Sequence, residues 1–321
     1  MKPLPHETEL EETLKAIEHL KKQNRDRPLF DNEIKRLERK LHQLKEEIYS
    51  NLTPWERITI SRHPARPHTS DYIAHLTSKF TELSGDRYFA NDHAIIGGLA
   101  QIDDEMKCVI IGQEKGKTTE SRLHHNFGMT NPEGYRKSLR LMRLAERFHL
   151  PIVTLIDTSG ANTTLGAEER GQGWAIAENL RAMSRLKTPI IVVIIGEGCS
   201  GGAIGIGIGD VIGILEHAYY SVISPEGCAS ILWKDKSRKE EAAASLCLNA
   251  EYLLKNGIVD AIIEEPLGGA HHNPQMAFEA VKTFIIEQWK MLKMIPPDIL
   301  IEQRYNKFRR MGAWKIKEDT N

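Results

Sequence analysis

The sequence predicts an α/β fold in which strands and helices alternate along the chain. Residues 151–156 and 189–195 are short runs rich in β-branched side chains, a composition typical of buried strands. Each run is followed by a glycine-containing turn and then by a stretch that favours a helix. Alternating strands and helices joined by right-handed crossovers are the architecture that this pattern indicates.

The first fifty residues instead predict a helical hairpin. Residues 7–50 are rich in charge, and their apolar residues recur at helical spacing. In the second half the spacing alternates between three and four residues, as in a coiled-coil seam: Ile34, Leu37, Leu41, Leu44 and Ile48. Residues 24–31 contain Pro28 and break this pattern, and Asp31 is the expected N-cap of the second helix. We expect residues 1–55 to form this hairpin as a packing or dimerisation element.

Residues 56–321 are expected to form one α/β domain with a C-terminal helical extension. Residues 51–90 are expected to be irregular except for a helix at 70–83. Further helices are predicted at residues 132–149, 168–186, 239–255 and 273–290. Besides the two runs above, strands are predicted at residues 95–102 and 108–113, which form a hairpin, and at 211–215, 221–223 and 258–262.

Composition excludes several classes of protein. The formal net charge of the 321 residues is -1, which gives no general reason to expect nucleic-acid binding. No apolar run approaches the roughly 18 residues of a membrane span, and the N-terminus lacks the apolar core of a signal peptide. The cysteines have no CxxC spacing, so we expect reduced thiols in a cytoplasmic protein and no zinc ribbon: Cys108, Cys199, Cys228 and Cys247.

The glycine-rich segment 196–202 has the clearest chemical meaning. It follows a predicted strand and precedes Ala203, where a tightly packed helix is expected to begin, so its backbone N–H groups are suited to bind an anion. The turn at residues 157–160 repeats the arrangement after the preceding strand. Two such turns on neighbouring strands predict a site that stabilises an oxyanion with backbone N–H groups. Neither the Rossmann, the P-loop nor the G-x-S-x-G pattern fits the segment.

Other polar groups have simpler interpretations. Ser224 is expected to cap a helix that has Pro225 in its first position, and residues 224–229 otherwise form a second wall of the site. The basic residues at 115–117 and 136–137 are expected to be solvated, unless a phosphate-rich acyl carrier or an acidic partner uses them. The histidine pairs 124–125 and 271–272 lack metal-ligand spacing and are expected at the surface. Few titratable groups lie near the glycine turns, which favours chemistry in which a substrate or cofactor supplies the base.

Several longer motifs carry a resemblance to a known family. The most specific is the run 221–234, SVISPEGCASILWK, and further matching stretches are RHP at 62–64, GDR at 85–87, AIIGG at 94–98, NFGM at 126–129, PEGYRK at 132–137, GAEERGQ at 166–172 and EPLGGAH at 265–271. The chain resembles the alpha subunits of bacterial-type acetyl-coenzyme A carboxylase carboxyltransferases, members of the crotonase superfamily. The resemblance covers most of the chain and implies a crotonase-like (ClpP/crotonase) core, a β-β-α spiral.

The resemblance also implies a function. An alpha subunit of this family acts with a zinc-ribbon beta subunit, as an α2β2 heterotetramer, alongside a biotin carboxylase and a biotin carboxyl carrier protein. Together the two subunits transfer the carboxyl group of carboxybiotin to acetyl-coenzyme A, giving malonyl-coenzyme A in the first committed step of fatty acid biosynthesis. ATP binding is expected only at the level of the whole complex, and no metal, membrane or nucleic acid is expected for this chain.

The family's site residues are carried over by position. Gly202 and Ala203, with Gly201, would present backbone N–H groups to the ureido oxygen of biotin, and the biotin anion would then deprotonate the acetyl methyl group. The expected substrate-binding residues surround these three: Asp157, Gly160, Gly198, Cys199, Ser200, Ser224, Glu226 and Gly227.

Three residues depart from the family's usual pattern. Ser159 stands in place of proline, Asn162 in place of tyrosine and Cys199 in place of glycine. Losing the proline makes the unfolded loop more flexible, at a cost in folding stability of a few tenths to ~1 kcal/mol.

Two alternative functions remain open at this point. One is another crotonase-type acyl-coenzyme A enzyme, which needs Glu197 or Glu226 as its base, and the other is a non-catalytic scaffold built on the hairpin.

Overall fold

The sheet is mixed, with an antiparallel edge and a parallel centre. The structure is a computed structural model that describes residues 4–24 and 30–312. Within them, eight strands form one sheet: β1 (Lys79–Glu82), β2 (Ile95–Gln101), β3 (Lys107–Gln113), β4 (Ile152–Thr158), β5 (Ile190–Cys199), β6 (Val211–Leu215), β7 (Tyr219–Ser221) and β8 (Ala261–Ile263). β1, β2 and β3 pair antiparallel, whereas β3, β4, β5, β6 and β8 follow in parallel, and β7 pairs with the end of β5.

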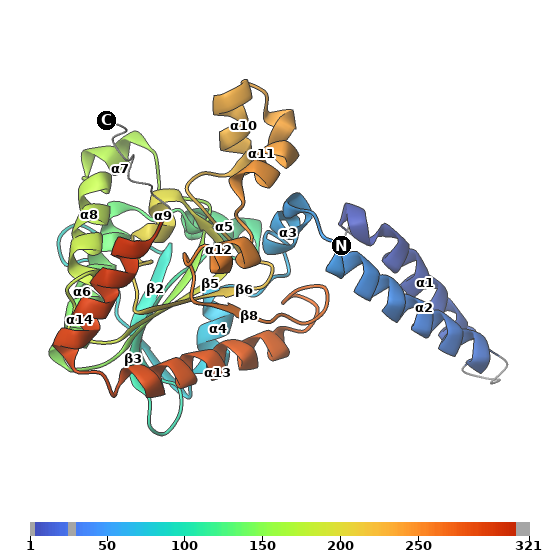
Figure 1. Cartoon of the computed structure of the whole chain (residues 1–321), viewed down its shortest axis with the longest axis horizontal. Helices are drawn as coiled ribbons and strands as arrows, with labels where there is room; N and C mark the ends of the chain where they lie inside the picture. The colour runs from blue at the N-terminus through green and yellow to red at the C-terminus, as the bar shows by residue number, and fades with distance from the viewer. Residues whose placement is uncertain (1–3, 25–29, 313–321) are drawn as a thin grey trace, which may run out of the picture.

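Helices cover both faces of this sheet (Figure 1). They are α1 (Thr8–Gln23), α2 (Asp31–Ser50), α3 (Pro54–Ser61), α4 (Thr69–Leu76), α5 (Thr119–His124), α6 (Pro132–Arg147), α7 (Leu165–Glu169), α8 (Gln172–Met183), α9 (Ser200–Ile204), α10 (Pro225–Trp233), α11 (Lys239–Leu246), α12 (Ala250–Lys255), α13 (Pro274–Leu292) and α14 (Pro297–Arg310), with 3-10 turns η1 (Pro5–Glu7), η2 (Asn126–Gly128) and η3 (Lys236–Arg238). α4 and α13 pack on one face, and α6 and α8 lie on the other. The main core fills the space between these layers, and the side chains of β4 and β5 are buried along their whole length.

The predicted strands and helices are largely confirmed. The hairpin of β2 and β3 and the central strands β4 and β5 lie where the sequence predicts them. The helix expected at residues 70–83 is wrong in its second half, because Thr77 is extended and residues 79–82 pair with β2 as strand β1. α3 falls in the segment expected to be irregular, and Thr53 caps it in a capping box with Glu56. α14, which follows the last predicted helix, was not predicted as a separate helix.

Three expected helices differ in length for a local reason. The helix predicted at residues 168–186 is divided into α7 and α8 by Gly171, whose φ of 81° is left-handed. The helix predicted at 239–255 is divided at Cys247, which has a φ of 50°. The helix expected to begin at Ala203 ends shortly afterwards, since α9 comprises only Ser200–Ile204. β7 ends at Ser221, where the sequence placed the start of a strand.

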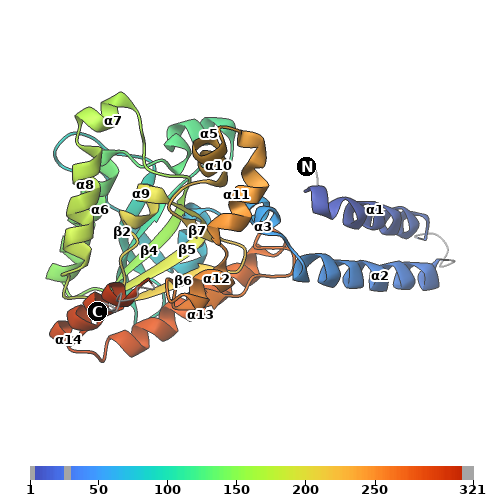
Figure 2. The same cartoon turned by 45° about the horizontal axis from the view of Figure 1, so that its top comes forward.

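The N-terminal hairpin is confirmed and projects from the body as an arm (Figure 2). Asp31 is not the N-cap of α2: it is the first helical residue, and its carboxylate accepts a hydrogen bond from the Asn24 side chain at 2.6 Å. Pro28, in the expected break, lies outside the described residues. At its inner end the hairpin packs on the body through a cluster that includes Leu10, Tyr49 and Ile60. The division into residues 1–55 and 56–321 stays a prediction.

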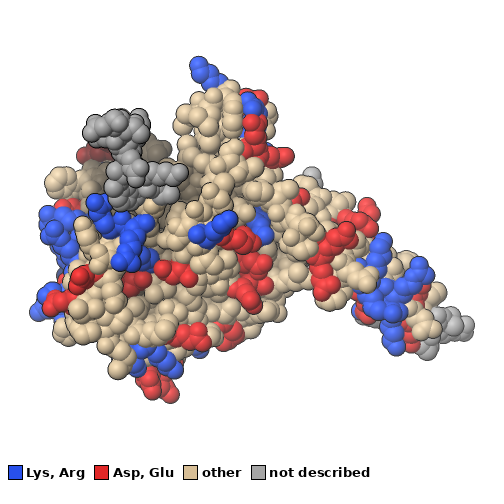
Figure 3. Space-filling view, in the orientation of Figure 1, with Lys and Arg blue, Asp and Glu red and all other residues tan. Residues whose placement is uncertain are grey.

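The surface carries charges of both signs. On the face shown in Figure 3, acidic and basic side chains are interspersed over the body and over the hairpin. α10 and α11 form a second projection, which packs on α3 (Figure 1). In the described ranges, no helix is both long enough and apolar enough to cross a bilayer.

Candidate active site

The two predicted glycine turns meet at the carboxyl edge of the sheet. β4 and β5 are parallel neighbours, so the turns that follow them leave the sheet at the same edge, where ligands of α/β proteins bind. A Cβ atom on Gly202 would lie 2.4 Å from the carbonyl carbon of Gly160 and 2.6 Å from the amide nitrogen of Ala161. No side chain fits at this contact, so glycine at position 202 fixes α9 against the turn after β4.

The backbone around Gly202 is held from two sides. The side on which a Cβ atom would stand is filled by the chain's own backbone, that of Gly160 and Ala161. The Gly202 carbonyl is held as well, since it accepts hydrogen bonds from the Gln113 side chain at 2.7 Å and from the Tyr135 hydroxyl at 3.3 Å. The backbone at the start of α9 is therefore rigidly placed before any substrate arrives.

The first turn of α9 offers backbone donors. Its first N–H groups, those of Ser200, Gly201, Gly202 and Ala203, precede the point at which an α-helix can satisfy its own donors. Among the described residues, the Gly202 N–H has no acceptor. Ser200 has a left-handed φ of 56°, an unusual conformation for a residue with a side chain, and such conformations cluster at functional sites. The geometry is suited to stabilise negative charge on an oxygen atom.

Two cavities flank the glycine contact. The apolar cavity, of 420 Å³, is lined by Ser200 and Gly201 on one side and by side chains that include Ile204, Tyr220, Cys247 and Leu253 on the others. The polar cavity, of 280 Å³, is lined by side chains that include Arg62, His68, Lys115, Ser159 and Glu197. Of the predicted site residues, Ser200 and Gly201 line the apolar cavity and none lines the polar one.

Buried ion pairs hold the carboxylates near the turns. Lys115 Nζ lies 2.7 Å from Asp157 Oδ1 and 2.5 Å from Glu197 Oε2. His68 Nδ1 lies 3.2 Å from Asp157 Oδ2, and the Glu197 N–H donates to Asp157 at 3.0 Å. The Asp157 carboxylate was predicted to bind substrate, but it is buried and fully engaged by these groups. It acts on the site by fixing Lys115 and the end of β5.

Glu197 is unsuited to act as a general base. Burial by itself would raise the pKa of its carboxyl group, but Lys115 and Arg62 outweigh burial and lower the pKa to about 2. Its oxygens also accept hydrogen bonds from Arg62 Nε and the Tyr219 hydroxyl, each at 2.6 Å. Glu226 is paired with the same guanidinium, at 2.6 Å from Arg62 Nη1. Both carboxylates that a hydratase-like alternative would need as a base are therefore occupied.

The side chain of Cys199 points into the interior. It is 1% exposed and packs in a small cluster with Ile58, Tyr219 and Leu248. Burial, followed by the charge of Glu197, raises the pKa of its thiol to about 12. The Cys199 side chain lines neither cavity, and the substrate-binding role of this residue stays a prediction. The partly exposed thiol beside the glycine turn is that of Cys247.

The remaining predicted residues make contacts within the chain, and their role in substrate binding stays a prediction. The Ser224 hydroxyl accepts a hydrogen bond from the Gly227 N–H at 3.1 Å, which confirms Ser224 as the N-cap of α10 with Pro225 next to it. Gly198 lies within the pairing of β5 with β7, where a Cβ atom would be 2.9 Å from the Tyr220 ring. Neither cavity is lined by Ser224, Glu226 or Gly227. The start of α10 is joined to the site through Arg62, which bridges Glu226 and Glu197.

Sequence reasoning missed several residues that build the site. Lys115 and Lys137 were expected to be solvated, yet Lys115 carries the ion pairs above, and Lys137 is buried with its Nζ donating to the carbonyls of Asp92 and Ile95. The position of Lys115 just after a buried strand, at the same edge as Asp157, was a usable signal. His68 had no such signal, because its contact with Asp157 depends on how α4 packs on the sheet.

Solved structures identify the fold. The chain is similar to transcarboxylase 12S, with a TM-score of 0.54, 15% identity and coverage of 82% of this chain and 47% of that one. It is also similar to the beta subunit of geranyl-CoA carboxylase from P. aeruginosa, with a TM-score of 0.54, 14% identity and coverage of 83% and 48%. The chain thus spans about half the length of each. This likeness concerns the fold alone, and it confirms the predicted crotonase-like fold.

The family follows from the sequence comparisons. The family model described as acetyl co-enzyme A carboxylase carboxyltransferase-like matches residues 3–312, and the chain belongs to this family. An acetyl-coenzyme A carboxylase carboxyl transferase subunit alpha from Protochlamydia amoebophila is 64% identical over 311 residues, which cover 97% of this chain and 98% of the relative. The protein of the same name from Chlamydia muridarum is 54% identical over 322 residues, covering 100% and 99%.

Proposed function

We propose that this chain is the alpha subunit of an acetyl-coenzyme A carboxylase carboxyltransferase in the cytoplasm. The observation that carries the proposal is the contact between the two glycine turns, which holds the first turn of α9 rigidly with its N–H groups available. The family and the full-length relatives support it. An alpha subunit implies a beta subunit, which we propose to be a zinc-ribbon protein in an α2β2 assembly served by a biotin carboxyl carrier protein and a biotin carboxylase.

In this proposal the backbone N–H groups of Gly202 and Ala203, with Gly201, receive the ureido oxygen of carboxybiotin. As the bond between the ureido nitrogen and the carboxyl carbon breaks, its electron pair stays on the ureido group, and these donors stabilise the resulting oxyanion. The biotin anion then removes a proton from the acetyl methyl group, and the carbanion attacks the released carbon dioxide to give malonyl-coenzyme A. Because biotin supplies the base, the occupation of Glu197 and Glu226 by Arg62 is no obstacle.

The two cavities beside the glycine turns differ in polarity, which supports a different role for each. The apolar cavity suits the apolar ring and alkyl chain of biotin, and Ser200 and Gly201 of the first turn of α9 line it. The locked ion pairs of the polar cavity keep Arg62, Lys115 and Asp157 in place around Ser159. We assign the apolar cavity to the biotin ring and the polar cavity to the positioning of the turns.

The direct test uses the chain in complex with a beta subunit of the family. We expect the complex to convert acetyl-coenzyme A to malonyl-coenzyme A with a carboxylated carrier protein as donor, and to leave crotonyl-coenzyme A unchanged. Product formation is followed by liquid chromatography and mass spectrometry. Hydration of crotonyl-coenzyme A without carboxyl transfer would show that the chain is a different crotonase-type enzyme.

A further inference from the structure

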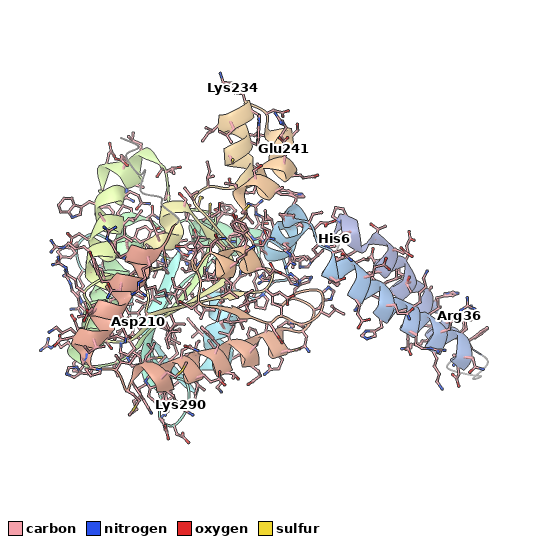
Figure 4. The ribbon with its side chains drawn as sticks, in the orientation of Figure 1. His6, Arg36, Asp210, Lys234, Glu241 and Lys290 are labelled. Carbon is pink, nitrogen blue, oxygen red and sulfur yellow. The ribbon has the colours of Figure 1, made fainter. Side chains whose placement is uncertain are left out.

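A cluster of imidazole and carboxylate groups lies away from the glycine turns, where the hairpin arm joins the body. His6 marks the inner end of the arm in Figure 4, and Glu7 follows it in the turn η1. The loop after β8 reaches this point from the body and carries His271 and His272 (Figure 1). The sequence alone did not indicate a metal site here, because two adjacent histidines lack ligand spacing and Glu7 is far away in the chain.

The three side chains are close enough to share one ion. One ligand atom from each of Glu7, His271 and His272 lies within 4.8 Å of the other two, and His272 Nε2 is 3.7 Å from Glu7 Oε1. Three atoms so spaced all lie within about 2.8 Å of a common point, so each needs to move by less than about 1 Å to reach zinc bonds of about 2.0–2.2 Å. Side-chain rotation is sufficient for a change of that size.

Neighbouring groups orient these three side chains. The Tyr49 hydroxyl donates to Glu7 Oε1 at 2.6 Å, and the Leu4 N–H donates to Oε2 at 3.1 Å. The ring of His271 stacks on that of His63, with centroids 3.8 Å apart and an interplanar angle of 21°. Supporting contacts of this kind around metal ligands set ring orientation and affinity.

The loop that carries the two histidines contains two glycines, at positions where a side chain would be strained or would clash. Gly268 and Gly269 have left-handed φ values of 98° and 104°. A Cβ atom on Gly268 would lie 2.5 Å from His272 Cδ2, and one on Gly269 would lie 3.2 Å from His271 Cε1. The backbone at these two glycines thus passes close to both imidazole rings.

A further observation points to a ligand. His271 Nδ1 is buried and has no hydrogen-bond partner among the described residues, and an unsatisfied buried nitrogen is costly unless something binds it. Imidazole nitrogens with one carboxylate form a donor set suited to zinc, whereas magnesium and calcium prefer oxygen ligands. His272 is exposed, so an ion from solvent can reach the group.

We propose that Glu7, His271 and His272 bind one Zn²⁺ ion that fastens the N-terminal hairpin to the body. The ion would join the turn η1 to the loop after β8, two segments whose contacts here include the 3.7 Å approach of His272 Nε2 to Glu7 Oε1, and the edge contact of the Tyr49 ring of α2 with the His272 ring adds to them. The three proposed ligands line neither of the cavities beside the glycine turns, and the cluster adjoins the polar cavity through His63, which lines that cavity and stacks on His271.

The test uses the full chain without a histidine tag, stripped with a chelator and titrated with Zn²⁺ alone by isothermal titration calorimetry. We expect one ion per chain and at least about a tenfold loss of affinity in Glu7→Gln and in His272→Gln. His125→Gln is the matched control. It alters a second histidine cluster, formed with His93 and His124, that provides no set of three ligand atoms in the described part of the chain.

A second measurement reports on the hairpin. Hydrogen exchange of α1 with and without Zn²⁺ should show added protection in the unaltered chain and in His125→Gln, and none in Glu7→Gln. Absence of zinc binding by the unaltered chain, or binding that both ligand variants retain, would overturn the site. Binding without added protection of α1 would overturn its role as a fastening.

Discussion

At the scale of single residues, Gly202 decides the geometry of the glycine turns. Its lack of a side chain allows α9 to press against Gly160 and Ala161, and its carbonyl is held by Gln113 and Tyr135. The backbone donors in the first turn of α9 therefore occupy fixed positions. Preorganised donors stabilise developing charge without reorganising during the reaction, which is the main contribution that we assign to this chain.

Replacing Gly202 tests that assignment. Gly202→Ala places a Cβ atom 2.4 Å from the Gly160 carbonyl carbon, so the turn must shift and displace a donor. We expect turnover of the complex with the beta subunit to fall by a factor on the order of 10²–10³. The rate is measured as malonyl-coenzyme A decarboxylation in the presence of biocytin. The control is Gly173→Ala in α8, where a Cβ atom meets nothing within 4 Å. Unchanged turnover in a folded Gly202→Ala complex would refute the role of this turn.

Chemical labelling of Cys247 tests whether biotin occupies the apolar cavity. Its partly exposed thiol lines that cavity next to Ser200 and Gly201, whereas the thiols of Cys108, Cys199 and Cys228 are buried. We expect N-ethylmaleimide to label Cys247 and to block carboxyl transfer by filling the cavity. Cys247→Gly should keep activity and lose the sensitivity, because the left-handed φ of 50° at this position suits glycine. Mass spectrometry identifies the labelled cysteine, and labelling of Cys247 with full turnover would show that biotin does not use this cavity.

At the scale of elements, the strands and their turns were the most predictable part of the molecule. The β-branched runs of β4 and β5 are buried along their length, and their glycine turns indicated in advance that the two turns meet. The divisions at Gly171 and Cys247 were missed, because a left-handed φ within a helix-favouring stretch depends on where the flanking helices pack. β1 was missed for a similar reason, since its residues become a strand only by pairing with β2.

The polar side chains of the site were less predictable than its backbone. Arg62, His68 and Lys115 come from three separate segments, and their partners Asp157, Glu197 and Glu226 from three more. No local pattern connects these residues, so only the assembled sheet edge shows that the carboxylates are paired. The sequence alone left Glu197 and Glu226 open as bases, and the ion pairs argue against both.

Arg62 connects α10 to the sheet, and its replacement tests that connection. Its guanidinium contacts Glu197 at the end of β5 and Glu226 in the first turn of α10, each at 2.6 Å. A lysine ammonium lacks the fork that reaches both carboxylates. Arg62→Lys should therefore weaken the attachment of α10 by about 1–3 kcal/mol and speed hydrogen exchange there. Arg238→Lys, which alters an exposed pair with Glu241 on α11, should leave exchange in α10 unchanged. Equal protection of α10 in all three proteins would contradict this role.

At the scale of the whole molecule, one buried ion pair joins distant parts of the chain. Arg66 and Glu265 form two hydrogen bonds of 2.8 and 2.6 Å, and Arg66 also donates to the carbonyl of Ile195 at the core of the sheet. Glu265 accepts further bonds from the N–H groups of His217 and Ala270. The segment after α3, the centre of the sheet and the loop after β8 therefore depend on one carboxylate.

This carboxylate makes stability depend on pH. Burial would raise the pKa of Glu265, but Arg66 outweighs it and lowers the pKa from its ordinary value of 4.5 to about 2. A lowered pKa means that the stabilisation is complete above about pH 4.5 and is lost as the pH falls toward 2. The free energy of unfolding, measured with urea between pH 7 and pH 3, should therefore decrease. Glu265→Gln should be less stable at pH 7 and decline less steeply, while the exposed Glu240→Gln should follow the unaltered chain. If the free energy of unfolding falls with pH equally steeply in the unaltered chain and both variants, Glu265 is not the source of the pH dependence.

The central claim is that this chain provides one half of a carboxyltransferase site. Its glycine turns supply backbone donors, and the carboxylates beside them are occupied by ion pairs. The most direct measurement is malonyl-coenzyme A decarboxylation with biocytin by the purified chain, with and without a beta subunit of the family. We predict negligible turnover for the chain alone and robust turnover for the complex. Robust turnover by the chain alone, or none by a stable complex, would contradict the account.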